Sequence, residues 1–234
     1  MLVVGVDGAR GGWAVVVSDN GRLRLSKALT FAEIFETHGS FDIVAVDMPI
    51  GLTESYEPGG RACERAARKM LGRGRASSVF PSPARAVLEA RTHKEACEIS
   101  RGSMPGGKGI SVQSFGILPK IKEVDLFLRK RPDLRDVVRE VHPEVCFHEM
   151  AQVPMKFSKK KPGGKAERTH ALRVHFPEID AFVAPPRTER LPLDDVLDAT
   201  AACWTAQRLA AGNGCSLIEP VLPDATGLKM TIWV

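Results

Sequence analysis

Two short apolar runs, each ending in an aspartate, constrain the fold of this 234-residue chain more than any other feature. The first run, LVVGVD, covers residues 2–7, and the second, IVAVD, covers residues 43–47. Continuous apolar runs of this length are typical of strands that are buried on both faces of a sheet. Each run therefore predicts a central strand with an acidic side chain at its C-terminal end.

The segment between the two runs predicts how these strands are connected. A glycine-rich turn at 8–12 leads into a second apolar strand at 13–17, and Asn20-Gly21 is a strong hairpin signal before a third strand. A short helix precedes the run at 43–47, which gives the order β-β-β-α-β. A right-handed crossover places the fourth strand beside the first and parallel to it, so the two aspartates are expected at the same edge of the sheet.

The rest of the chain predicts an α/β fold with a mixed five-stranded sheet flanked by helices. Residues 52–116 are rich in Gly, Pro, Ser and Arg and are interpreted as a helical and loop insertion into a single domain that covers 1–234. Residues 137–147 predict a fifth strand. The lysine-rich stretch 156–165 is expected to be a mobile loop, and residues 192–211 give the strongest helix pattern.

Asp7 and Asp47 are the first candidates for a functional site. One aspartate at the end of an apolar strand is best explained by hydrogen bonds from the following turn. Two aspartates at equivalent ends of neighbouring strands are different, because like charges at that separation repel each other without a cation between them. The pair therefore predicts a metal site.

Three further carboxylates are candidates for the same site. Asp195 and Asp198 are three residues apart, so they share one face of the predicted helix at 192–211. Asp194 is expected to be the N-cap of that helix, whereas Asp198 lies too far along it to cap. Glu144 lies near the end of the predicted fifth strand and reaches the same edge if that strand lies beside the fourth. A surface role is an equal alternative for Glu144.

Magnesium or manganese suits such a set of carboxylates, since hard oxygen ligands with room for water and phosphate match the preferences of these ions. One ion or two would serve an in-line displacement at a phosphate ester. We therefore predict Asp7, Asp47, Asp195 and Asp198 as metal ligands and catalytic residues, with Glu144 as an additional catalytic candidate.

A basic segment follows the second aspartate and is predicted to bind substrate phosphates through its charge. Its members are Arg61, Arg65, Arg68, Lys69, Arg73 and Arg75. The net charge of +5 permits a polyanionic partner, so nucleic acid, RNA or DNA, is the expected partner. A solvated helix face with one internal pair between Glu64 and Arg68 is an equal alternative.

Cysteine usage and hydropathy indicate where such a chain works. The five cysteines are widely spaced, odd in number and without a Cys-x-x-Cys pair, which fits a reducing cytoplasm. No apolar run approaches the 18 residues or so that a membrane span needs. We expect neither a membrane span nor a signal peptide.

The quoted motifs resemble those of the RNase H-like superfamily, which includes RNase H, retroviral integrases and RuvC-type resolvases. More narrowly, the chain resembles the domain-of-unknown-function 429 family, whose members are described as RNase H-like nucleases by prediction. The supporting motifs are VGVDG at 4–8, VAVDMPIG at 44–51, SVF at 78–80, HPE at 142–144 and DVLDA at 195–199. The resemblance implies an RNase H-like core and a metal-dependent nuclease. Asp7 and Asp47 would be ligands, Asp195 or Asp198 would complete the site, and Glu144 would be a fourth candidate.

Three functions remain open on these grounds. The first is a nuclease that uses Mg²⁺ or Mn²⁺ to hydrolyse phosphodiester bonds of RNA or DNA. The second is a nucleotide phosphotransferase or hydrolase of the actin-like class, whose first hairpin also carries Asp-Gly, although such folds use two halves. The third is a non-catalytic domain that binds nucleic acid or nucleotides on the same scaffold.

Overall fold

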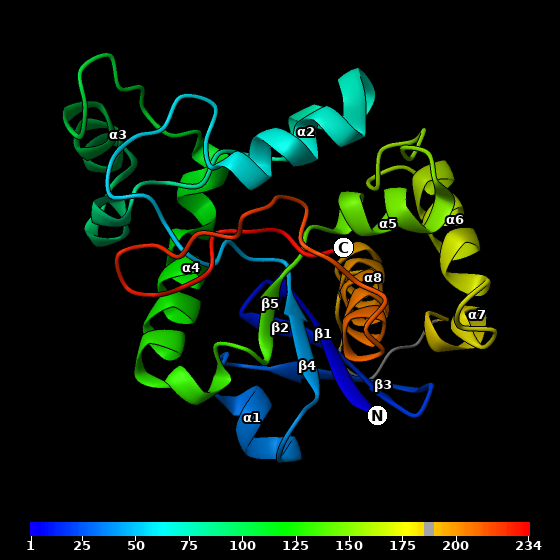
Figure 1. Cartoon of the computed structure of the whole chain (residues 1–234). Helices are drawn as coiled ribbons and strands as arrows, with labels where there is room; N and C mark the ends of the chain where they lie inside the picture. Colours follow the sequence, from blue (N-terminus) through cyan, green and yellow to red (C-terminus); the bar gives the residue numbers. More distant parts are fainter. Residues whose placement is uncertain (185–189) are drawn as a thin grey trace.

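A five-stranded mixed β-sheet forms the centre of the chain in a computed structural model that describes residues 1–184 and 190–234 (Figure 1). The strand order is β3-β2-β1-β4-β5, with an antiparallel meander of three strands and two strands added in parallel to β1. The strands and their connecting helix are β1 (Leu2–Ala9), β2 (Gly12–Asp19), β3 (Arg22–Ala28), α1 (Glu33–His38), β4 (Ile43–Val46) and β5 (Val138–Glu140). The predicted β-β-β-α-β order is confirmed, and the sheet is consistent with an RNase H-like core.

A two-residue turn joins β2 to β3, as the Asn-Gly pair predicted. Asn20 and Gly21 have φ angles of 49° and 90°. Positive φ at both central residues is what a type I′ turn requires, and the twist of such a turn matches that of the flanking strands. The turn therefore fixes the antiparallel register in which Asp19 pairs with Arg22.

Two long helices cover the two faces of the sheet, with α8 (Leu193–Ala210) on one face and α4 (Val112–Lys130) on the other (Figure 1). Against α8 pack α5 (Pro143–Ala151) and α6 (Pro162–Arg173), and α7 (Ile179–Phe182) packs on α6. The remaining helical elements of residues 1–184 and 190–234 are α2 (Ala62–Arg75), α3 (His93–Gly102) and three 3₁₀ helices, Ala76–Ser78, Arg85–Glu89 and Pro132–Leu134. None of the helices in the described part of the chain is long and apolar enough to span a membrane.

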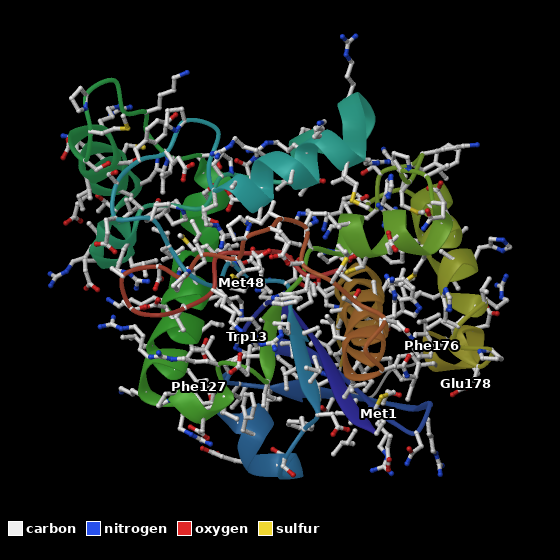
Figure 2. The ribbon with its side chains drawn as sticks, viewed as in Figure 1. Met1, Trp13, Met48, Phe127, Phe176 and Glu178 are labelled. Atoms are coloured by element: carbon white, nitrogen blue, oxygen red, sulfur yellow. The ribbon has the colours of Figure 1, made fainter. Side chains whose placement is uncertain are left out.

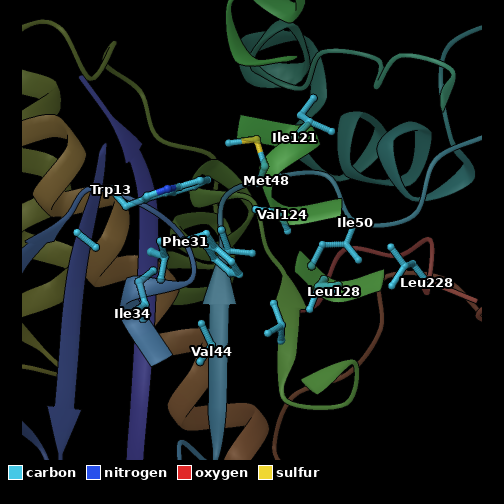
Figure 3. Close-up of a cluster of buried hydrophobic side chains, with 14 of the residues drawn as sticks. Trp13, Phe31, Ile34, Val44, Met48, Ile50, Ile121, Val124, Leu128 and Leu228 are labelled. Carbon is cyan, nitrogen blue, oxygen red and sulfur yellow. The ribbon is translucent and has the colours of Figure 1, made fainter. Parts of the chain in front are cut away.

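The sheet separates two hydrophobic cores because successive side chains of a strand point to opposite faces. Val4 and Val6 of β1 belong to the α4 core together with Trp13 (Figure 3). Val3 belongs to the α8 core, which extends out to Phe176. Figure 2 shows Trp13 near the centre of the molecule and Phe176 beside α6 and α7. The same alternation directs the odd-numbered residues of β1 toward α8.

The fifth strand is much shorter than predicted. β5 ends at Glu140, and the rest of the predicted strand at 137–147 is mostly helix α5. Pro143 occupies the first turn of α5. Proline suits that position because its fixed φ is helical and its missing N–H would have had no partner there. Glu144 is consequently a residue of the first helical turn and not of a strand.

Residues between β4 and α4 carry α2, α3 and two of the 3₁₀ helices, in agreement with the helical and loop composition predicted for 52–116. Their status as an insertion into one domain stays a prediction. The C-terminal tail contacts both β5 and the segment that follows β4. Trp233 N–H donates to the carbonyl of Glu140 at 2.9 Å, and Asp224 accepts from Leu52 N–H at 2.9 Å.

Candidate active site

Asp7 and Asp47 stand side by side at the carboxyl edge of the sheet. β1 and β4 pair in parallel with Val6 opposite Val46, and Asp47 N–H donates to the Val6 carbonyl at 2.9 Å. Both aspartates lie on the face covered by α8, because they alternate with these valines. The predicted proximity is confirmed, whereas their role as metal ligands stays a prediction.

Helix α8 brings Asp198 to the same place because it lies directly on β1. A Cβ atom added to Gly5 would stand 2.0 Å from the Ala199 carbonyl oxygen and 2.1 Å from the Cys203 nitrogen. Only a glycine allows two backbones to approach so closely. The Asp198 side chain, one residue before this contact, is 1% exposed and interacts electrostatically with Asp7.

Burial and mutual repulsion make these three carboxylates hard to ionise. Burial raises the pKa of Asp7 well above its ordinary value, and the charges of Asp47 and Asp198 raise it further. Burial also raises the pKa of Asp47, although a hydrogen bond with Asp7 and the charge of Lys159 oppose the change. For Asp198, burial raises the pKa to about 6 against the attraction of Lys159. Such shifts are typical of functional sites.

Asp195 and Asp194 occupy the rim of the site. Asp195 is half-buried, and burial followed by the charge of Asp194 raises its pKa. The prediction that Asp194 caps α8 is wrong, since the N-cap is Pro192 and Asp194 lies within the first turn. Asp194 instead accepts a hydrogen bond from the Lys160 ammonium at 2.5 Å.

Lys159 supplies a positive charge at the centre of the acidic cluster. Its Nζ lies 2.5 Å from Oδ2 of Asp198, and the charges of Asp198, Asp7 and Asp47 raise its pKa against the opposing effect of burial. The predicted loop at 156–165 is confirmed for residues 156–161 and wrong for 162–165, which belong to α6, and its mobility stays a prediction. Within the loop, Lys159 and Lys160 are both paired with aspartates. An acidic helix and a lysine-rich stretch in one chain were the only sequence signal for this contact.

Glu144 lies beside the cluster but is held by a different partner. The Arg168 guanidinium, 1% exposed, donates to Oε1 of Glu144, while Oε2 is buried and accepts no hydrogen bond from the described residues. Glu144 raises the pKa of Asp47, and the neighbouring His142 lowers it. Glu144 is therefore near the site, with half of its carboxylate used by Arg168. The sequence patterns did not indicate Arg168.

One residue of the predicted phosphate-binding segment, Arg61, is buried in the structure and is not available to bind phosphate. Arg61 is 2% exposed and forms ion pairs with Glu64 and Glu140, at 2.8 Å and 2.6 Å. Its placement on a solvent-facing surface is wrong, because a buried guanidinium must satisfy its donors inside the protein. The alternative pair between Glu64 and Arg68 is also wrong, since Glu64 is committed to Arg61 and Ser82.

The other basic residues of the segment stay at or near the surface. Arg65, Lys69 and Arg73 are exposed. Arg68 is half-buried and donates to the carbonyls of Val79, at 2.9 Å, and of Gly59. Arg75 is half-buried, donates to the Met155 carbonyl at 2.7 Å and lies 3.9 Å from Glu144.

The C-terminal end of α2 lies close to the site, and the phosphate-binding role of its basic residues stays a prediction. Helix α2 contacts α5, and Figure 1 shows it running toward α5 above the sheet. The C-terminal end of α2 therefore carries positive charge toward Glu144 and the carboxylates beyond it.

The donor chemistry of the cluster fits a hard divalent cation. Asp7, Asp47 and Asp198 come from three different parts of the chain. The charges of Asp47 and Asp198 raise the pKa of Asp7, and the charge of Asp47 raises that of Asp198, as carboxylates lacking a full counter-charge do. Among residues 1–184 and 190–234, no group of three or more acidic, His or Cys side chains is already arranged to hold a metal ion. Lys159 donates to one of the three, so its ammonium uses a carboxylate oxygen that could otherwise bind the metal ion.

A family match covers nearly the whole of this architecture. The family described as "Protein of unknown function (DUF429)" matches residues 5–222. The chain belongs to this family. The part of the DUF429 chain that is matched includes Asp7, Asp47, Asp198 and the lysine that contacts Asp198. No curated protein and no solved structure matches the chain.

Proposed function

We propose that this DUF429 protein is a divalent-metal-dependent nuclease that hydrolyses phosphodiester bonds of RNA or DNA. One observation carries the proposal: Asp7, Asp47 and Asp198, from two strands and a helix, converge at the carboxyl edge of the sheet closely enough to perturb one another's pKa. Ligands of open α/β sheets bind at this edge. The β-β-β-α-β order of an RNase H-like core supports the same function.

The roles of the residues follow from their positions. Asp7, Asp47 and Asp198 would hold Mg²⁺ or Mn²⁺, with Asp195 at the rim, and the ion would supply an activated water for attack on the phosphodiester. Lys69 and Arg73, exposed on the helix that approaches α5, would contact the backbone phosphates of the nucleic acid.

Metal binding and hydrolysis by the Asp47→Asn variant test this function. We expect wild type to bind Mn²⁺ in a calorimetric titration and to cleave labelled RNA or DNA, and Asp47→Asn to lose both activities. Asp133→Asn is the matched control, because Asp133 is exposed on the 3₁₀ helix Pro132–Leu134 and pairs with Arg131. A fold check by circular dichroism accompanies each variant.

The outcomes separate the alternatives. Hydrolysis of ATP without cleavage of nucleic acid would identify the nucleotide hydrolase instead. Mn²⁺ binding without turnover of any substrate would identify a non-catalytic binding domain. Equal Mn²⁺ affinity in wild type and Asp47→Asn would refute the site itself.

The proposed cellular setting is the cytoplasm. All five cysteines are free thiols, with Cys215 exposed and the other four buried. An exposed free thiol is compatible with a reducing compartment, where disulfides are rare.

A further inference from the structure

The segment that carries Lys159 is held in place by the first turns of α6. Glu167 accepts hydrogen bonds from the backbone N–H groups of Lys156 and Phe157, at 2.8 Å and 3.0 Å. The Arg168 guanidinium donates to the Phe157 carbonyl at 3.1 Å. These contacts fix the backbone two residues before Lys159, so the position of its side chain is supported by the fold.

Close backbone packing against α6 also holds the same segment. A Cβ atom added to Gly164 would stand 2.0 Å from the carbonyl oxygen of Ser158. The helix can lie against the segment at this distance only because position 164 has no side chain. The segment that carries Lys159 is therefore positioned by its packing against α6.

The ammonium and a divalent cation would use the same carboxylate oxygen. Nζ of Lys159 donates a charge-assisted hydrogen bond to Oδ2 of Asp198 at 2.5 Å. The Asp198 side chain is 1% exposed. The charge of Lys159 also acts on Asp7 and Asp47. The neighbouring Lys160 pairs with Asp194 outside the cluster and is 72% exposed along its side chain.

We propose that Lys159 is an internal counter-ion that competes with the divalent cation for Asp198, so that metal binding displaces the ammonium from this carboxylate. The inference rests on the proposed function, because it concerns the same metal site. The proposal assigns a role to the lysine-rich segment, because Lys159 compensates part of the negative charge of the site before the metal ion binds. The observed affinity for the metal ion then depends on how much more strongly the ion interacts with Asp198 than the Lys159 ammonium does.

The test is a calorimetric Mn²⁺ titration of wild type, Lys159→Met and Lys160→Met. Methionine keeps an unbranched apolar stem of four heavy atoms like that of lysine and lacks the ammonium. We expect Lys159→Met to bind Mn²⁺ about tenfold more tightly than wild type, the size expected for losing one competing charge-assisted hydrogen bond. Lys160→Met, the matched control, is expected to stay within about twofold of wild type because exposed pairs contribute little.

A second measurement uses the wild-type protein and does not depend on whether a variant folds. Amine acylation followed by peptide mass spectrometry reports the accessibility of each lysine. We expect saturating Mg²⁺ to increase the labelling of Lys159, since the ion releases it from Asp198, and to leave Lys160 unchanged.

Each outcome bears on a separate claim. Wild type that binds Mn²⁺ while Lys159→Met binds it equally or more weakly would overturn the competition and leave the metal site standing. Labelling of Lys159 that falls or stays constant on Mg²⁺ addition would overturn it as well. Absence of Mn²⁺ binding in wild type and in Lys159→Met would remove the metal site and, with it, the proposed nuclease.

Discussion

Replacing Asp198 by asparagine is expected to stabilise the protein at neutral and alkaline pH, at the expense of its function. The carboxylate is buried on α8 against β1 and is repelled by Asp47, and Lys159 compensates only in part. Asparagine has nearly the same shape and carries no charge. Its side-chain oxygen still accepts from the Lys159 ammonium, so the substitution removes the ionisation cost with little change in packing.

The magnitude follows from the pKa of Asp198, which burial raises from 3.8 to about 6. A difference of roughly two units corresponds to about 3 kcal/mol, at about 1.36 kcal/mol per unit. The raised pKa already includes the attraction of Lys159, so this attraction is not subtracted again. The full effect on the free energy of unfolding is therefore about 3 kcal/mol.

The sign of the pH dependence follows from proton binding. An aspartate whose pKa is higher in the folded state binds more protons there, so stability falls as the pH rises from about 4 through about 6. Above this window both states are ionised and the whole cost is present. The advantage of Asp198→Asn is therefore expected at pH 8 and should have almost vanished at pH 4.

Urea denaturation at pH 8 and pH 4, without divalent cations, measures this advantage. Asp133→Asn is the control, because it removes an exposed carboxylate that pairs only with Arg131 among the ion pairs of the described residues. An Asp198→Asn variant that is no more stable than wild type at pH 8 would refute the reasoning. An equal advantage at both pH values would also refute it, because the effect would then not come from ionisation.

Three further perturbations test the supporting structure. Gly5→Ala is expected to lower the free energy of unfolding by about 3 kcal/mol in urea denaturation, because the added Cβ would overlap the Ala199 carbonyl. A loss below about 1 kcal/mol would contradict this packing. Arg61→Met is expected to cost about 3–5 kcal/mol by the same assay because it leaves two glutamates buried without their partner, and a neutral result would mean that the guanidinium is not buried. The double variant Lys69→Ala and Arg73→Ala is expected to bind nucleic acid more weakly. The slope of log K against the logarithm of the salt concentration should become shallower by about 0.9 per lost phosphate contact, and an unchanged slope would show that neither residue contacts phosphate.

Local sequence patterns were sufficient for the central sheet. The apolar runs that end in Asp7 and Asp47 predicted two buried parallel strands, and the Asn-Gly pair predicted the hairpin between β2 and β3. These signals are reliable because strand burial and turn geometry depend on a few adjacent residues. The proximity of the two aspartates then followed from the right-handed crossover alone.

The errors came from segments whose state depends on distant partners. Residues 137–147 are apolar enough to suit either a strand or a buried helix. Pro143 favours the helix, because proline is well suited to the first helical turn that it occupies in α5. Arg61 belongs to a basic stretch in the sequence, but in the structure it is buried in an ion pair with Glu140, which lies far along the chain. Periodicity cannot report such a pairing, because it records only neighbours along the chain.

The sequence by itself determined the order of the first four strands and the two neighbouring aspartates of β1 and β4, since the strands follow from local hydrophobic patterning. Only the tertiary structure decided the rest of the candidate site. Asp198 joins the aspartates because Gly5 lets α8 lie on β1, and Lys159 reaches Asp198 because α6 holds its segment. Both contacts join residues far apart in the chain, and their energies come from packing and charge across the fold.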